Sequence, residues 1–296
     1  MALTLNLEES SAPLRDAASV VLLRDAAQGM EVFLMQRHGQ SDVLGGAYVF
    51  PGGKVDREDA EIDEHQHLDQ PVDALHGHLG EPDLRVEQAV ALYVAALREA
   101  FEECGVLLAS PDGDGRSVDA TQAMALLREG HALDEVLGLM RLRLQTRDVH
   151  PWSRWITPKR PSLMQKRFDT RFFVTVVPPD QTALHDGREA TDSLWITPRA
   201  ALERYWRDEL PLAPPQIMSI AHLAHHSSVD SVLAEARTRR PPVIQPEALD
   251  LDGTRHVCYP GDPSHPLRDR ALPGPTRLRY ANGRFEPLDG FEAFFA

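Results

Sequence analysis

"LREAFEECGV", residues 97–106, ends a segment whose apolar residues form one regular stripe. Apolar side chains recur at steps of three and four from Val86 to Cys104, which predicts a long helix that begins near Asp83. Gly105 follows the last apolar position and is therefore the predicted C-cap of this helix. The last turn carries three carboxylates, on Glu99, Glu102 and Glu103.

These three glutamates occupy positions that an isolated helix disfavours. At about 100° per residue they share one arc of about 100°, opposite the apolar stripe. Glu99 and Glu103 are like charges four residues apart, which costs roughly 0.2–0.5 kcal/mol, and the helix dipole also disfavours anions in the last turn. Arg98 can pair with Glu102 but cannot neutralise all three. Clustered carboxylates suit a hard divalent cation, so from the helix alone a metal site and a solvated acidic face are equal alternatives.

The composition limits the partners of the chain. It has 296 residues, 42% of them hydrophobic, and a formal net charge of −14, which argues against nucleic acid or an anionic membrane as the main partner. Two cysteines are too few for a disulfide framework. There is no apolar run of ~20 residues and no basic, apolar secretory start. We therefore expect a cytoplasmic protein without a membrane segment, and the sequence leaves a homodimer open.

Apolar and β-branched runs predict the strands. Residues 17–24 and 30–37 are expected to form a hairpin, and residues 45–54 a strand that runs into a Pro-Gly-Gly turn. Later strands are expected at residues 167–178 and 193–197, and a hairpin with an Asn-Gly turn at residues 278–287. Further helices are expected at residues 119–129, 131–144, 198–209 and 215–238.

Two stretches lack these patterns. From Glu58 to Pro82 the chain is polar and contains four histidines without a zinc-type spacing, so an exposed loop is expected there. After the Arg-Arg-Pro-Pro sequence at residues 239–242 the chain is rich in proline and glycine. Residues 241–296 are therefore expected to form a β-rich extension that packs on the main domain.

The glycine turn and the glutamates together resemble the Nudix box, GX5EX7REUXEEXGU with U an apolar residue, which is the signature of the Nudix hydrolases. Gly53 matches the first glycine, and the second half of the box is matched by Arg98, Glu99, Ala100, Glu102, Glu103, Gly105 and Val106. The sequence departs from the pattern in two ways. Asp59, with Glu58 beside it, stands where the box has its first glutamate, and 38 residues (60–97) stand where the box has seven.

The resemblance implies the Nudix fold, an α/β (α+β) architecture in which helices cover both faces of a mixed sheet as an α/β/α sandwich. We assign residues 1–240 to this domain, with an insertion at about residues 60–82 inside the box and a helical insertion at about residues 117–145. Residues 241–296 are the β-rich C-terminal extension. A long insertion inside the box is similar to the branch of the family that includes the mammalian peroxisomal coenzyme A diphosphatase.

The resemblance also implies a chemistry, the hydrolysis of a nucleoside diphosphate linked to another group with Mg²⁺ or Mn²⁺ as cofactor. Carried over by position, Glu102 and Glu103 would be the main metal ligands, with Glu99 and the carbonyl of Gly52 as further ligands. Arg98 would orient the glutamates. The supporting positions of the box would be Asp59, Glu58 and Gly105.

The general base and the phosphate ligands are expected outside the box. Glu189 and Asp192 lie in the loop before a late strand and are the candidate bases, with a solvated loop carboxylate as the alternative for each. Arg167 and Arg171 belong to a basic island, and Arg37 ends a predicted strand. With Gly53, where the backbone can approach a ligand closely, these arginines are the candidate substrate-binding residues.

We therefore expect a diphosphatase that cleaves coenzyme A or acyl-coenzyme A to phosphopantetheine and adenosine 3′,5′-bisphosphate. The first alternative is a diphosphatase of ADP-ribose or a nucleotide sugar. The second is a non-catalytic Nudix-like module that binds a nucleotide and regulates another protein. In each case the partner is a small molecule linked through a nucleoside diphosphate.

Overall fold

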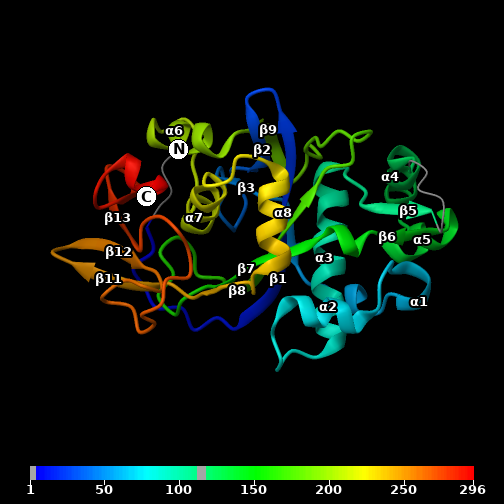
Figure 1. Ribbon diagram of the computed structural model, residues 1–296, viewed down its shortest axis with the longest axis horizontal. Helices are drawn as coiled ribbons and strands as arrows, with labels where there is room; N and C mark the ends of the chain where they lie inside the picture. Colours follow the sequence, from blue (N-terminus) through cyan, green and yellow to red (C-terminus); the bar gives the residue numbers. More distant parts are fainter. Residues whose placement is uncertain (1–4, 112–117) are drawn as a thin grey trace.

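A computed structural model describes residues 5–111 and 118–296 of the chain. Residues 1–4 of the predicted domain and Ser117 of the predicted helical insertion lie outside the described residues. A large mixed sheet runs through the middle of the molecule, with helices on both sides and a second sheet at one end (Figure 1). Among the described helices, none is both long and apolar enough to cross a bilayer.

The central sheet is built on a long first strand. β1 (Leu14–Ala26) forms the predicted hairpin with β2 (Gly29–Arg37) and pairs in parallel with β8 (Arg167–Val176), which makes the sheet mixed. The strand order is β10-β7-β8-β1-β2-β3, with β4 paired to β1 and β9 paired to β2. The remaining strands are β3 (Tyr48–Val49), β4 (Gly52–Lys54), β7 (His150–Ile156), β9 (Ala190–Ile196) and β10 (Val243–Ile244). The strands predicted at residues 167–178 and 193–197 are confirmed.

One face of the sheet is covered by α3 (Val86–Cys104), which confirms the predicted helix. Its predicted C-cap is also confirmed, because Gly105 takes a left-handed φ of +71°. Alternate residues of β1 point to opposite faces, so Val20 and Leu22 join the cluster under α3. Tyr93 of α3 packs on Phe173 with ring centroids 4.7 Å apart. The same side carries α4 (Ala120–Arg128), α5 (Leu133–Met140), and a small sheet of β5 (Ala109–Pro111) and β6 (Leu142–Leu144).

The other face is covered by three helices, α6 (Pro198–Trp206), α7 (Pro214–Leu223) and α8 (Val229–Thr238). The prediction of one helix over residues 215–238 is wrong, since α7 ends at Leu223 and the Ser228 hydroxyl caps a new helix by accepting the Ser231 N–H. The prediction over residues 131–144 is also wrong at its end. Arg141 takes a left-handed φ of +54°, and the chain then continues as β6.

The insertion inside the box is not the exposed loop that its polar composition predicted. It forms η1 (Glu58–Ala60), α1 (Glu64–His67) and α2 (Val72–Leu79). Leu75 and Leu79, four residues apart on α2, are buried in the same core cluster as α3. A few apolar residues at helical spacing therefore outweigh the polar composition, and most of the polar residues of α1 and α2 stay exposed.

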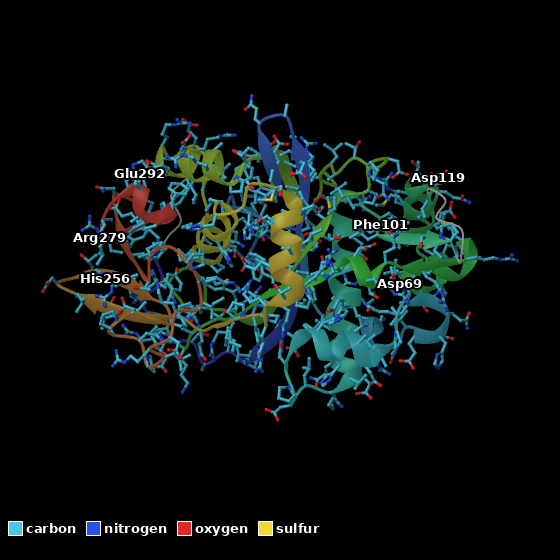
Figure 2. The ribbon with its side chains drawn as sticks, viewed as in Figure 1. Asp69, Phe101, Asp119, His256, Arg279 and Glu292 are labelled. Carbon is cyan, nitrogen blue, oxygen red and sulfur yellow. The ribbon has the colours of Figure 1, made fainter. Side chains whose placement is uncertain are left out.

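The C-terminal extension is β-rich, as predicted. It is an antiparallel sheet of β11 (Glu247–Leu251), β12 (Thr254–Cys258), β13 (Arg277–Ala281) and β14 (Arg284–Pro287), followed by η3 (Phe291–Phe295). The hairpin predicted at residues 278–287 is confirmed, and Asn282 and Gly283 take the positive φ angles of its tight turn. Figure 2 shows His256, Arg279 and Glu292 of the extension at the opposite end of the molecule from Asp69 and Phe101.

The extension shares its core with the main domain. Leu278 and Phe285 belong to the same buried cluster as Trp155 of the central sheet. Tyr205 of α6 clamps β14, because its hydroxyl donates to the Phe285 carbonyl at 2.7 Å and accepts the Phe285 N–H at 2.8 Å. We keep the division of the chain at residue 240 as a proposal, and expect the two parts to unfold together.

Removing the Tyr205 hydroxyl tests this coupling. We expect Tyr205→Phe to lower the free energy of unfolding by about 1–3 kcal/mol, because it leaves buried polar groups of Phe285 unpaired. Urea denaturation followed by fluorescence and circular dichroism should show one shifted transition. Tyr93→Phe is the matched control, since the buried Tyr93 hydroxyl has no partner among the described residues and its removal should not destabilise the fold. Two separate transitions in the wild type would contradict the shared core.

Candidate active site

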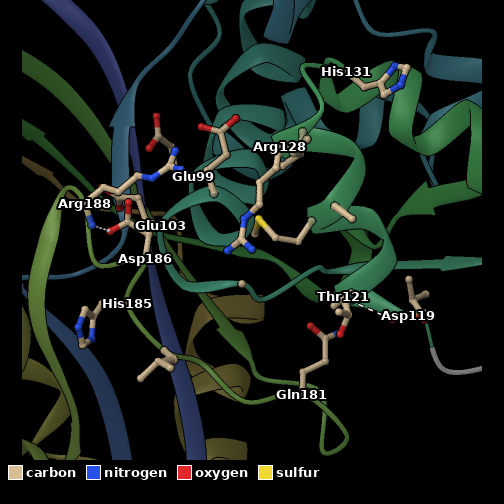
Figure 3. A pocket seen from close by; sticks show the side chains of 18 of the residues that line it. Glu99, Glu103, Asp119, Thr121, Arg128, His131, Gln181, His185, Asp186 and Arg188 are labelled. Carbon is tan, nitrogen blue, oxygen red and sulfur yellow. Dashed lines mark hydrogen bonds between the residues drawn. The ribbon is translucent and has the colours of Figure 1, made fainter.

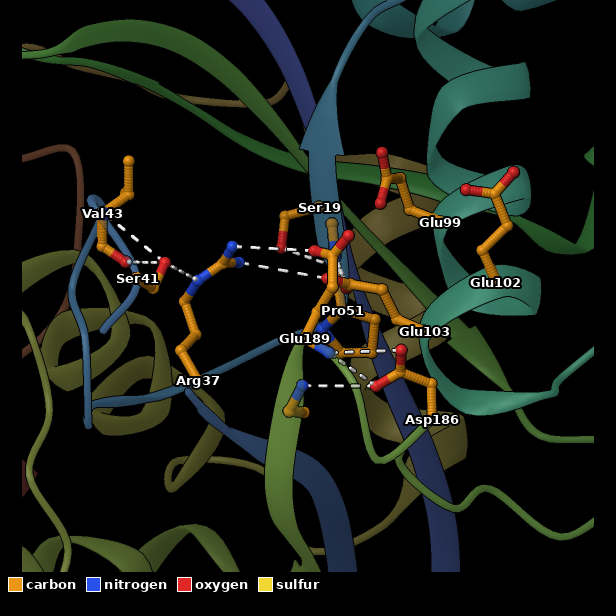
Figure 4. A network of polar contacts seen from close by, with 12 residues as sticks. Ser19, Arg37, Ser41, Val43, Pro51, Glu99, Glu102, Glu103, Asp186 and Glu189 are labelled. Atoms are coloured by element: carbon orange, nitrogen blue, oxygen red, sulfur yellow. Dashed lines mark hydrogen bonds and ion pairs between the residues drawn. The ribbon is translucent and has the colours of Figure 1, made fainter. Parts of the chain in front are cut away.

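The glycine turn and the last turn of α3 lie against one another. The Gly52 N–H donates a hydrogen bond to Glu103 Oε2 at 2.8 Å. A Cβ atom added to Gly53 would lie 2.2 Å from Glu99 Oε1, closer than any real contact, so any other residue there would displace the Glu99 carboxylate. Figure 4 shows the carboxylates of Glu99 and Glu103 beside this turn, with Glu102 farther out.

The three glutamates differ in exposure. Their side chains are 12% exposed at Glu99, 44% at Glu102 and only 6% at Glu103. The sequence predicts all three on the arc opposite the apolar stripe but does not predict that Glu103 is buried. The glycine turn covers part of the face that the isolated helix would expose.

Burial makes the charged forms of these carboxylates costly. Loss of solvent raises the pKa of Glu99 to about 7, although Arg98 acts in the opposite direction. Loss of solvent, and then the charge of Glu99, raises the pKa of Glu103 to about 8. The pKa of Glu102 is raised for the same first reason. Three converging carboxylates with too little positive charge around them fit a divalent cation with oxygen ligands.

Arg98 holds the cluster together through Asp59. Its Nε and Nη2 donate to the two oxygens of Asp59 at 2.8 and 3.0 Å, and Nη1 donates to Glu99 at 2.9 Å and Glu102 at 3.2 Å. Asp59 is 2% exposed and also accepts the Asp56 N–H at 2.8 Å. The shorter aspartate at this box position therefore reaches Arg98 from η1.

Glu58 does not share the supporting role that the sequence assigned to it. Its side chain is exposed and has no hydrogen bond or ion pair within the described part of the chain. The single turn of η1 directs Asp59 inward and leaves its neighbour in solvent.

Arg37 and Glu189 face the cluster from β2 and from the start of β9. Arg37 lies 3.9 Å from a carboxylate oxygen of Glu103 and 3.9 Å from one of Glu189 (Figure 4). Glu189 is 66% exposed, and its charge contributes to the raised pKa values of Glu99 and Glu103. Asp186, which sequence reasoning missed, fixes this loop by accepting the N–H groups of Glu189 and Ala190. The Asp-Gly pair at residues 186–187 was the signal for such a turn.

Asp192 does not join Glu189. It accepts a hydrogen bond from the Tyr48 hydroxyl at 2.5 Å and helps burial to raise the pKa of Tyr48 to about 12. Its side chain lines neither cavity at the glutamates. Glu189 precedes β9, whereas Asp192 lies within the strand and pairs with Gln36 of β2.

Arg167 and Arg171 are also held elsewhere. Arg171 is 3% exposed and pairs with Asp16 and Glu81 at 2.7 Å each, on the α2 side of the sheet. Arg167 donates to the carbonyls of Thr157 and Pro158. The structure does not bring either arginine to the glutamates. Neither lines a cavity there, and both bind neighbouring segments of the chain instead.

Two cavities meet at the glutamates. Glu99, Glu102, Glu103 and Glu189 line both of them. The larger, about 1480 Å³, has many charged side chains among mixed polar and apolar lining residues. It is bordered by α4 and by the loop before β9, with Arg128, Arg188, His131 and His185 around it (Figure 3). The smaller, about 490 Å³, passes Gly52, Gly53 and Arg37 and extends over the other face of the sheet. A substrate with its diphosphate at the glutamates could place one half in each cavity.

The chain is similar to known proteins. The family model "NUDT19 Nudix domain" matches residues 68–223. The acyl-coenzyme A diphosphatase NUDT19 of Homo sapiens is 28% identical over 276 residues, covering 80% of this chain and 72% of its own length. The Xenopus laevis protein of the same name is 26% identical over 275 residues, covering 80% and 71%.

A solved structure is also similar. The crystal structure of a Nudix hydrolase from Alicyclobacillus acidocaldarius is 31% identical, covers 76% of this chain and 97% of its own, and superposes with a TM-score of 0.63. The family model spans more than half of the chain, and the box residues converge as described above. The chain therefore belongs to the Nudix hydrolase family and is a Nudix pyrophosphohydrolase.

Proposed function

We propose that the protein is a Mg²⁺- or Mn²⁺-dependent diphosphatase of coenzyme A and acyl-coenzyme A. The products are phosphopantetheine, acylated or not, and adenosine 3′,5′-bisphosphate. The observation that carries the proposal is the meeting of two cavities at one carboxylate cluster, of which the larger is lined more densely by charged side chains than the smaller. Coenzyme A has halves of correspondingly different character, a charged nucleotide and a neutral pantetheine arm. Curated relatives named as acyl-coenzyme A diphosphatases support the same substrate class.

Glu99, Glu102, Glu103 and the carbonyl of Gly52 are the proposed metal ligands. When bound, the cation neutralises the diphosphate and lowers the pKa of a bound water. Arg98 keeps Glu99 and Glu102 in place, since it donates to both while Asp59 fixes its other edge.

Glu189 is the proposed general base. It faces the glutamates from a loop fixed by Asp186, and its exposed carboxylate is free to reach a water at the cluster. The water oxygen forms a bond to one phosphorus, Glu189 takes the water proton, and the bridging P–O bond breaks to release the other phosphate. Arg37, 3.9 Å from both Glu103 and Glu189, is placed to hold a phosphate oxygen, and Gly53 lets the diphosphate approach the backbone.

One assay distinguishes the proposed substrate from the alternatives. Wild-type protein with Mg²⁺ or Mn²⁺ would be compared on coenzyme A, acetyl-coenzyme A, ADP-ribose, NADH and nucleotide sugars. We expect the highest kcat/KM on coenzyme A or its thioester. A higher value on ADP-ribose or a nucleotide sugar would transfer the proposal to that substrate. Binding without hydrolysis of any of them would support the regulatory alternative.

Loss of one carboxylate tests the metal site. We expect Glu103→Gln to lower kcat on coenzyme A by more than about 100-fold, because a lost ligand should exceed the 10–100-fold typical of an outer-shell partner. EDTA should abolish wild-type activity, and Mg²⁺ should restore it. Glu58→Gln is the matched control, since Glu58 is an exposed glutamate of the same box and should keep wild-type kinetics. Equal rates for Glu103→Gln and wild type would rule out the metal assignment.

Asp59 provides a separate test of the residues that support the proposed metal ligands through Arg98. We expect Asp59→Asn to reduce kcat/KM by about 10–100-fold and to raise the Mn²⁺ concentration for half-maximal activity, because Arg98 loses its charged partner. The measurement is a Mn²⁺ titration of coenzyme A hydrolysis, with thermal unfolding as a check on folding. An unchanged Mn²⁺ dependence in a folded variant would show that Arg98 orients the glutamates without Asp59.

A further inference from the structure

The smaller cavity has an apolar inner part, to which the C-terminal extension contributes. We call this part the apolar chamber and define it by Trp155, Leu163, Met164, Phe168, Pro246 and Val257. Trp155 and Phe168 belong to the central sheet, and Leu163 and Met164 to the loop between β7 and β8. Pro246 and Val257 come from the extension, whose role the sequence did not reveal. The chamber therefore closes only when the extension is folded onto the domain.

Charge is confined to the mouth of this cavity. The charged residues that line it within the described part of the chain are Arg37, Lys54, Asp56, Arg98, Glu99, Glu102, Glu103 and Glu189. All of them belong to the glycine turn, the end of α3 or the Arg37–Glu189 side of the site. The chamber itself suits a neutral chain, because a charged group would lose its solvation there without gaining a counter-ion.

Gln216 adds a polar contact to this apolar wall. It lies in the first turn of α7, is 7% exposed and lines the same cavity. Its Oε1 is buried and accepts no hydrogen bond from the described residues. Buried amide oxygens are rarely left without a donor, so a ligand N–H group is the natural partner.

We propose that the apolar chamber takes the pantetheine arm and the acyl chain of the substrate. An amide N–H of pantetheine then donates to Gln216, and the acyl chain packs against Leu163, Met164 and Val257. This inference rests on the proposed function and deepens it. The 3′-phosphorylated nucleotide half is directed to the larger cavity, where Arg128 and Arg188 make no side-chain ion pair with other described residues (Figure 3). The extension thereby becomes a determinant of acyl-chain preference.

The test compares free coenzyme A with acyl-coenzyme A of increasing chain length. In the wild type, kcat/KM should rise with each methylene that enters the chamber, by up to roughly fourfold per buried methylene. In Leu163→Trp, the ratio of kcat/KM for dodecanoyl-coenzyme A to that for coenzyme A should fall at least tenfold, because the larger ring fills the chamber. Leu163→Ala, which carries little folding risk, should lower the same ratio by a smaller factor.

Gln216→Leu tests the contact with the pantetheine amide separately from the packing of the acyl chain. It should raise KM about three- to tenfold for coenzyme A and dodecanoyl-coenzyme A alike, since both carry the pantetheine amides, and it should leave their ratio near the wild-type value. Leu267→Trp is the matched control, because Leu267 is 57% exposed on the same extension and lines neither cavity. The KM of Leu267→Trp for coenzyme A and its KM for dodecanoyl-coenzyme A should equal those of wild type.

The outcomes distinguish the assignment of the chamber from the proposed substrate. Equal fold losses on both substrates in a folded Leu163→Trp variant would show that the acyl chain lies outside the chamber and would overturn the inference. A wild type whose kcat/KM does not depend on chain length would also overturn it, while coenzyme A hydrolysis would still support the proposed function. A wild type that cleaves neither substrate would remove the proposed function, and the inference with it.

Discussion

The Arg98–Asp59 ion pair is the interaction on which the active-site geometry depends. Three carboxylates in one helical turn repel one another, and burial against the glycine turn increases the cost of their charge. Arg98 offsets part of this cost by donating to two of the glutamates, but its guanidinium can do so only if it is held in one orientation. Asp59 supplies that orientation through a bidentate contact from a buried position.

The same pair explains how a long insertion is tolerated inside the box. The two halves of the motif are held together by side-chain contacts. The number of residues between them can therefore vary, provided that α3 still packs against the glycine turn. α2 achieves this by packing its own apolar residues into the cluster beneath α3. The insertion is thus a structural layer of the domain.

Much of this structure could be predicted from the sequence, and the failures have physical causes. The α3 stripe, the β1–β2 hairpin and the Asn-Gly hairpin are local patterns, and each is confirmed. The convergence of Gly53 and Glu99 was available only through the resemblance to a known motif. The burial of Glu103, the ion pairs of Arg171 and the turn between α7 and α8 depend on contacts between distant segments, which no local period encodes.

The ion pairs that hold Arg171 away from the active site also bind the insertion to the central sheet. Glu81, just after α2, lies 2.7 Å from Arg171 and 2.8 Å from Arg154, and both arginines also meet Asp169. Deleting the insertion to restore the usual box spacing would leave these guanidinium groups without Glu81. Breaking a buried pair of this kind typically costs about 3–5 kcal/mol, a large part of the stability of a domain. A descendant of this chain could therefore shorten the box only after first replacing arginines that lie outside it.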